Sequence, residues 1–233
     1  MKSGSIGLLV VCVFMWTSLC TLMPTGASAA EASAPQEAPQ ETNIVLDTEV
    51  KENGPAYEIK QTIDKIIAQL RTIDSTSEWR ANVTALVRGK FNFQVMSQGV
   101  LGPNWHRASV QERERFVELF ALLLEETYIG RVREYTDQQI RFGTEQIREN
   151  RAMVDTYISM DSGAEIPISY KMLKHEDEWQ VYDVVIEEVS LVRNYRSSYS
   201  GVLRKKNVSG LLDEMQSKIE ELKQRHAEED GSV

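Results

Sequence analysis

Cysteine is almost absent from this chain. Its only two cysteines among 233 residues, Cys12 and Cys20, lie in an apolar N-terminal segment. That segment has no charge over Ile6–Met23 and ends in small residues before Ala30, a pattern typical of a cleaved secretory signal over residues 1–29. An uncleaved anchor is the alternative. Neither cysteine follows a small residue, which excludes a lipoprotein site, and cleavage leaves no cysteine for disulfides or thiol chemistry.

Motifs for metal binding and catalysis are also missing. The three histidines, at positions 106, 175 and 226, are too far apart in the sequence for a common metal-ligand spacing. The chain has no GxSxG and no phosphate-binding loop. We therefore expect no metal and no cofactor.

Positive charge is in deficit as well. Removal of the signal leaves 25 Lys+Arg against 35 Asp+Glu, a net charge of −10, with no dense basic stripe. Nucleic acid is therefore not an expected partner. No second apolar run is long enough to span a bilayer, so we expect a soluble product beyond the inner membrane.

What the chain does contain is a core-sized region between two polar ends. Residues 30–54 are rich in Ala, Pro, Gln and Glu and predict a flexible leader, and residues 225–233 predict a disordered, charged tail. Residues 55–224 between them are long enough to bury a hydrophobic core.

Helical periodicity comes first in this region. It predicts helices from Pro55 to about residue 73, from about residue 75 through Val87, and over residues 91–100 with Gly99 and Gly102 as terminators. A longer helix follows a capping box. In this motif the side chains of Ser109 and of the glutamate three residues later each accept a hydrogen bond from the backbone N–H of the other residue. Its apolar stripe is wider than a surface helix needs, so we expect it to be deeply buried or to face a cavity.

Period-two alternation then predicts about four antiparallel strands, because their short links exclude parallel crossovers. Pro167 indicates an edge or a bulge. Both faces of the fourth strand look apolar, and Ser190 after it is expected to cap the next helix rather than to act as a nucleophile. Two closing helices, to about residues 203 and 224, complete an α+β fold in which helices wrap a twisted antiparallel sheet. The four strands are expected near residues 140–149, 152–158, 166–172 and 179–186.

Two functional hypotheses follow from the residues. In the first, apolar side chains from the long helix, the sheet and the next helix line a pocket for hydrocarbon, although ordinary core packing explains many of them. In the second, Asp155, Tyr157, Tyr182 and Asp183 form an enzyme site with a buried carboxylate as base. We favour solvent-facing or loop-capping roles for these acids. The candidate pocket residues are Phe120, Leu123, Tyr128, Val154, Ile166, Ile168, Tyr170, Val184, Ile186, Val189, Leu191 and Tyr195.

An ordered set of short segments resembles one known family. The segments are VLG at 100–102 with Trp105 and Ser109, ERERF at 112–116 with Phe120 and TY at 127–128, WQVYD at 179–183, EVSL at 188–191, NYRS at 194–197, and LR at 203–204 with SGL at 209–211. Together they are similar to the MlaC (toluene-tolerance) family over roughly residues 60–222.

The resemblance implies a periplasmic phospholipid carrier without catalysis and without a cofactor, its bound phospholipid being cargo. It implies a pocket for acyl tails between sheet and helices, to which Leu101 is added, with Val189 at the mouth and Ile166 facing it. Glu188 departs from the family, which usually has glycine there, and a side chain at this position could narrow the mouth or add negative charge near the head group.

The partners implied by the resemblance are an inner-membrane ABC transporter with MCE domains and an outer-membrane lipoprotein–porin complex. The carrier is expected to be a monomer that maintains the lipid asymmetry of the outer membrane. Three alternatives stay open: a hopanoid or other lipid carrier, a small periplasmic enzyme that uses Asp155 or Asp183, and an adaptor without cargo.

Overall fold

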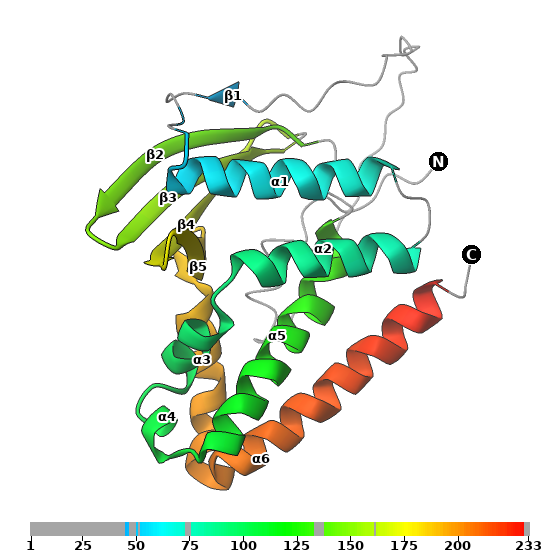
Figure 1. Cartoon of the computed structure of the whole chain (residues 1–233). Helices are drawn as coiled ribbons and strands as arrows, with labels where there is room; N and C mark the ends of the chain where they lie inside the picture. Colours follow the sequence, from blue (N-terminus) through cyan, green and yellow to red (C-terminus); the bar gives the residue numbers. More distant parts are fainter. Residues whose placement is uncertain are drawn as a thin grey trace, which may run out of the picture. The chain divides into compact units, whose positions relative to one another are not determined.

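The computed structural model in Figure 1 describes residues 45–46, 50, 52–72, 76–132, 138–160 and 162–230. All of them belong to one compact unit, Thr42–Val233. The expected signal peptide and most of the expected leader lie outside the described residues. None of the described helices is long and apolar enough to cross a membrane.

The first half of this unit is helical, as the sequence predicts. Asn92 caps α3 by accepting a hydrogen bond from the Val95 N–H at 2.9 Å, and Gly102 ends it with a φ of 54°. Gly99 lies inside α3, so its predicted role as a terminator is wrong. A Cβ there would lie 2.6 Å from a methyl carbon of Val192, so this glycine lets α3 approach the last helix closely. The helices are α1 Pro55–Thr72, α2 Thr76–Lys90, α3 Phe93–Leu101, α4 Asn104–Arg107 and α5 Val110–Val132.

The predicted capping box is confirmed at the start of α5. The Ser109 Oγ accepts from the Glu112 N–H at 3.2 Å, and the Glu112 carboxylate accepts from the Ser109 N–H at 2.8 Å. Both bonds satisfy backbone donors that the first helical turn leaves without a partner.

The sheet has four long antiparallel strands, as predicted, and a short strand at each edge. One short strand, Val45–Leu46, pairs in parallel with Arg141 and Phe142, so part of the expected flexible leader is sheet. The long strand that contains Pro167 has a neighbour on both sides and its register shifts elsewhere, so the predicted edge or bulge at this proline is wrong. In sheet order the strands are β1 Val45–Leu46, β2 Ile140–Arg148, β3 Arg151–Ser159, β4 Glu165–His175, β5 Glu178–Ile186 and β6 Val189–Ser190.

A β-bulge explains why β5 looks apolar on both faces. Val181 pairs with Met172, Asp183 with Lys171 and Val184 with Tyr170, so Tyr182 is the extra residue in the ladder. Met172 and Tyr170 are two residues apart and share a face, so Val181 and Val184 share that face although they are three apart. The bulge therefore turns the apolar residues at both ends of β5 toward the same side.

That side of the sheet is the one that helices cover. Figure 1 shows α1 lying along β2 and β3, where Ile59 packs with Phe142 and Val154 in one hydrophobic cluster. The opposite face is more polar: Ser169 donates to Asp155 at 2.6 Å, and the Arg141 guanidinium lies 4.1 Å from the centre of the Tyr157 ring.

The last described element is α6, Leu191–Asp230, which is interrupted at Asn207 with a φ of 58°. The two helices predicted here are therefore present, and the second lies beside α5 (Figure 1). It continues past the expected end near residue 224, and the His226 Nδ1 lies 3.1 Å from a Glu126 carboxylate oxygen. The part of the expected disordered tail up to residue 230 is thus helical.

Candidate functional site

An apolar cavity of about 210 Å³ lies among α2, α5 and the end of β5. The beginnings of α3 and α6 complete its wall. Among the described lining residues, Glu125 carries the only charge, and Thr84 and Tyr128 contribute the only other polar side-chain atoms. The lining residues are Val83, Thr84, Val87, Phe91, Phe93, Leu124, Glu125, Tyr128, Ile129, Val184, Ile186 and Leu191.

Helical and strand spacing explain how these residues come together. Val83, Val87 and Phe91 recur every four positions and so present one face of α2 and its end. Leu124 and Tyr128 do the same on α5. From the sheet, the bulge in β5 turns Val184 and Ile186 to this side.

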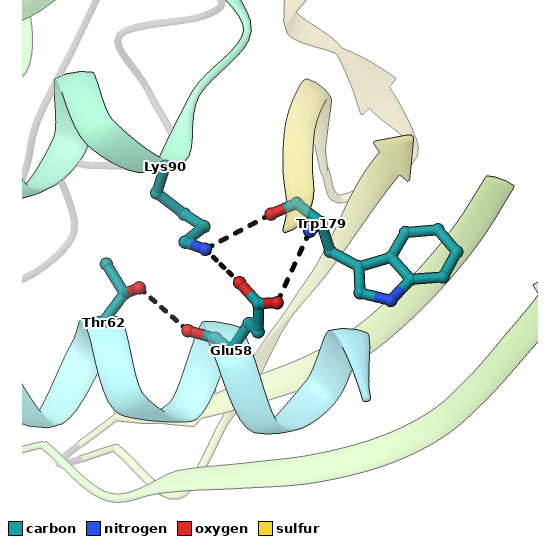
Figure 2. Close-up of polar contacts among 4 residues, drawn as sticks. All are labelled: Glu58, Thr62, Lys90 and Trp179. Carbon is teal, nitrogen blue, oxygen red and sulfur yellow. Dashed lines mark hydrogen bonds and ion pairs between the residues drawn. The ribbon is translucent and has the colours of Figure 1, made fainter. Parts of the chain in front are cut away.

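A polar cluster fixes the end of α2 to the sheet beside the cavity. Figure 2 shows the Glu58 carboxylate accepting from the Lys90 ammonium and from the Trp179 N–H, the latter at 3.4 Å. The Lys90 Nζ also donates to the Trp179 carbonyl at 3.3 Å, and the Asn92 N–H donates to the Val181 carbonyl at 2.8 Å. These bonds hold Phe91 at the cavity wall, because it lies between Lys90 and Asn92.

An ion pair connects α2 to α5 at the cavity. The Arg88 Nε and Nη2 donate to the two oxygens of Glu125 at 2.5 and 2.8 Å. The hydrogen bond to Glu125 is the main cause of the raised pKa of Arg88. The Arg88 side chain is 45% exposed and that of Glu125 only 10%, so the pair extends from solvent to the cavity wall.

Four of the predicted pocket residues line this cavity: Tyr128, Val184, Ile186 and Leu191. The others lie elsewhere. Leu101, Phe120 and Leu123 are in the core between α3, α5 and α6, against which Tyr195 packs, and Val154 and Tyr170 are in the core between the sheet and α1. Ile166 is buried, Ile168 and Val189 are half-buried, and none of the three lines the cavity. For all of the predicted pocket residues, including those that line the cavity, contact with a ligand stays a prediction.

The contribution of α2 to the cavity was not predicted from the sequence. The sequence shows the apolar stripe on α2, but a stripe does not show which helix or strand it faces. The cavity-lining residues that were not predicted, from α2 and from its neighbours α3 and α5, are Val83, Thr84, Val87, Phe91, Phe93, Leu124, Glu125 and Ile129.

The connection after β5 is a two-residue hairpin at Glu187 and Glu188, with φ values of 46° and 69°. Two consecutive positive φ values are the pattern of a type I′ turn, which favours glycine at its second position. Glu188 is exposed and is not among the residues that line the cavity, and its effect on the pocket mouth stays a prediction.

The proposed enzyme residues have structural partners outside the cavity. Asp183 is 5% exposed and accepts from the Ser190 hydroxyl at 2.7 Å, the Val192 N–H at 3.1 Å and the Lys171 ammonium at 3.1 Å. Ser190 accepts from the Arg193 N–H at 3.1 Å, so it caps α6 as predicted. Neither Asp155 nor Asp183 lines the cavity. The described residues contain no group of three or more metal-ligating side chains.

Three half-buried tyrosines pack against the hydrophobic clusters next to the cavity. Burial is the largest cause of the raised pKa of Tyr170, Tyr195 and Tyr199. The Tyr195 ring packs edge-to-face on Phe120, with 5.2 Å between the ring centres. These hydroxyls are therefore expected to stay protonated in the folded protein.

Comparison with known proteins gives consistent matches. The family model described as MlaC protein matches residues 58–217. A Haemophilus influenzae protein named intermembrane phospholipid transport system binding protein MlaC is 25% identical over 183 residues, which are 74% of this chain and 86% of that protein. A Ralstonia solanacearum phospholipid-binding protein, solved in complex with a phospholipid, has the same fold with a TM-score of 0.66 and 18% identity, over 72% of this chain and 97% of the other. Because the family model covers more than half of its residues, the chain belongs to the MlaC family.

Proposed function

We propose that this protein is a phospholipid carrier that holds acyl tails in the cavity between α2, α5 and β5 and leaves the head group at its rim. The observation that carries the proposal is an apolar cavity in whose wall Glu125 is the one charged side chain among the residues that the structure describes. The names of its relatives, a transport-system binding protein and a phospholipid-binding protein, support the same cargo.

Such a site needs no catalytic group. Each tail methylene removed from water contributes about 0.8 kcal/mol, so ten buried methylenes contribute about 8 kcal/mol before the costs of binding. The cavity of about 210 Å³ is smaller than the ~300 Å³ at which pockets for small ligands begin. A lipid with two tails therefore requires α2 and α5 to move apart.

The carrier is further proposed to be a periplasmic monomer without enzymatic activity. It takes and delivers lipid between an inner-membrane ABC transporter with MCE domains and an outer-membrane lipoprotein–porin complex. Such exchange serves the lipid asymmetry of the outer membrane.

The test is to purify the protein natively from its own cells, denature it and identify the released lipid by mass spectrometry. We expect about one diacyl phospholipid per protein. A hopanoid in its place would keep the carrier function and change the cargo. Protein that is repeatedly empty and takes up no lipid from vesicles would refute the proposal.

A further inference from the structure

The ion pair between Arg88 and Glu125 combines three properties at one place. It lies at the cavity wall, it contains one charge of each sign, and its arginine is half exposed. An acyl tail in the cavity brings its head group to the nearest polar rim, because the phosphate is costly to bury. The geometry therefore places a head group next to this pair.

The charges around the pair oppose a purely anionic head group. Glu125 accepts both hydrogen bonds from Arg88, and Glu118, two turns earlier on α5, is close enough to contribute to the raised pKa of Arg88. Lys90 at the end of α2 is already paired with Glu58. An anionic lipid that captured Arg88 would leave the Glu125 carboxylate without its partner and beside a phosphate, which is unfavourable.

We propose that Arg88 and Glu125 form a head-group site that selects zwitterionic phospholipids. The guanidinium binds the phosphate through two parallel N–H donors, and the carboxylate binds the ammonium group of a lipid such as phosphatidylethanolamine. When the lipid binds, the phosphate replaces Glu125 as the partner of Arg88, and the ammonium group replaces Arg88 as the partner of Glu125. No charge is therefore left unpaired. This inference rests on the proposed carrier function and adds the head group that the carrier prefers.

The test is competition between two lipids. Delipidated protein is incubated with vesicles of equimolar phosphatidylethanolamine and phosphatidylglycerol, and both lipids are quantified after re-isolation. We expect the wild type to hold about fivefold more phosphatidylethanolamine, the ratio that a modest ion-pair preference gives.

Two variants separate head-group selection from a structural role, because they break the same ion pair. In Glu125→Gln the free guanidinium attracts phosphate and the ammonium loses its partner, so the ratio should fall to about one or below. In Arg88→Gln the remaining carboxylate repels phosphate and keeps the ammonium, so phosphatidylglycerol should fall further while total loading drops. Glu214→Gln, which breaks an exposed ion pair with Lys206 in α6, is the matched control and should keep the wild-type ratio.

The outcomes distinguish this inference from the carrier function. Loading with the same lipid ratio in the wild type and all three variants would refute head-group selection and leave the carrier intact. A shift of the lipid ratio in the same direction for Glu125→Gln and Arg88→Gln would also refute head-group selection, since the loss of a purely structural ion pair would change the ratio in the same way in both variants. Protein that loads neither lipid would refute the carrier function and this inference with it.

Discussion

A larger side chain on the sheet side of the cavity should weaken lipid binding without unfolding the protein. Val184 lies on β5 after the bulge and lines the cavity, so a larger side chain there extends into the space of about 210 Å³. Val184→Phe adds about four carbon atoms, which displace about four tail methylenes at ~0.8 kcal/mol each, or about 3 kcal/mol. We expect phospholipid affinity to fall on the order of a hundredfold.

The assay is titration of delipidated protein with a fluorescent phospholipid, accompanied by thermal unfolding. The unfolding temperature of the free protein should not fall, because the added ring occupies empty space. Val110→Phe is the control, since Val110 is 60% exposed at the start of α5 and does not line the cavity. Unchanged affinity in a folded Val184→Phe variant would mean that the tails bind elsewhere.

Three further predictions concern stability. Glu188→Gly should raise the free energy of unfolding by about 1 kcal/mol in urea titrations, because glycine adopts the observed positive φ without a steric penalty; a decrease would contradict the turn assignment. Asp183→Ala should cost about 3 kcal/mol of unfolding free energy and leave lipid loading per folded molecule unchanged, because the carboxylate is a buried partner of three donors; full stability with lost loading would contradict this role. The raised pKa values of Tyr170, Tyr195 and Tyr199 stabilise the fold fully below the unfolded-state pKa of about 10, and this stability is lost as pH rises toward the folded-state values. Alkaline denaturation should therefore coincide with tyrosinate absorbance, and ionisation of these groups in a folded protein would disprove it.

Local signals in the sequence predicted the elements of the fold well. The capping box at Ser109 and Glu112 and the cap at Ser190 depend on residues a few positions apart, and both are present in the structure. The four-strand meander followed from short links that leave no other pairing. Such features need no knowledge of distant contacts.

The cavity was only partly predictable, because it depends on contacts between distant segments. The bulge in β5 changes which side chains share a face, and no residue type in WQVYDVVI marks its position. The pairing of Arg88 with Glu125 joins residues 37 positions apart, so periodicity within either helix does not reveal it. Gly99 shows the same limit, since its close approach to Val192 depends on how α3 packs on α6.

In the proposed complex, a phospholipid binds with its tails in the cavity between α2, α5 and β5. Photo-crosslinking tests it most directly: the protein is loaded with a diacyl phospholipid that carries a photoreactive group at the end of one tail, irradiated, digested and mapped by mass spectrometry. We expect adducts on peptides that contain Val87, Tyr128 or Val184. Adducts confined to the polar face of the sheet around Asp155 and Lys171, or no adduct in protein that carries lipid, would contradict binding in this cavity.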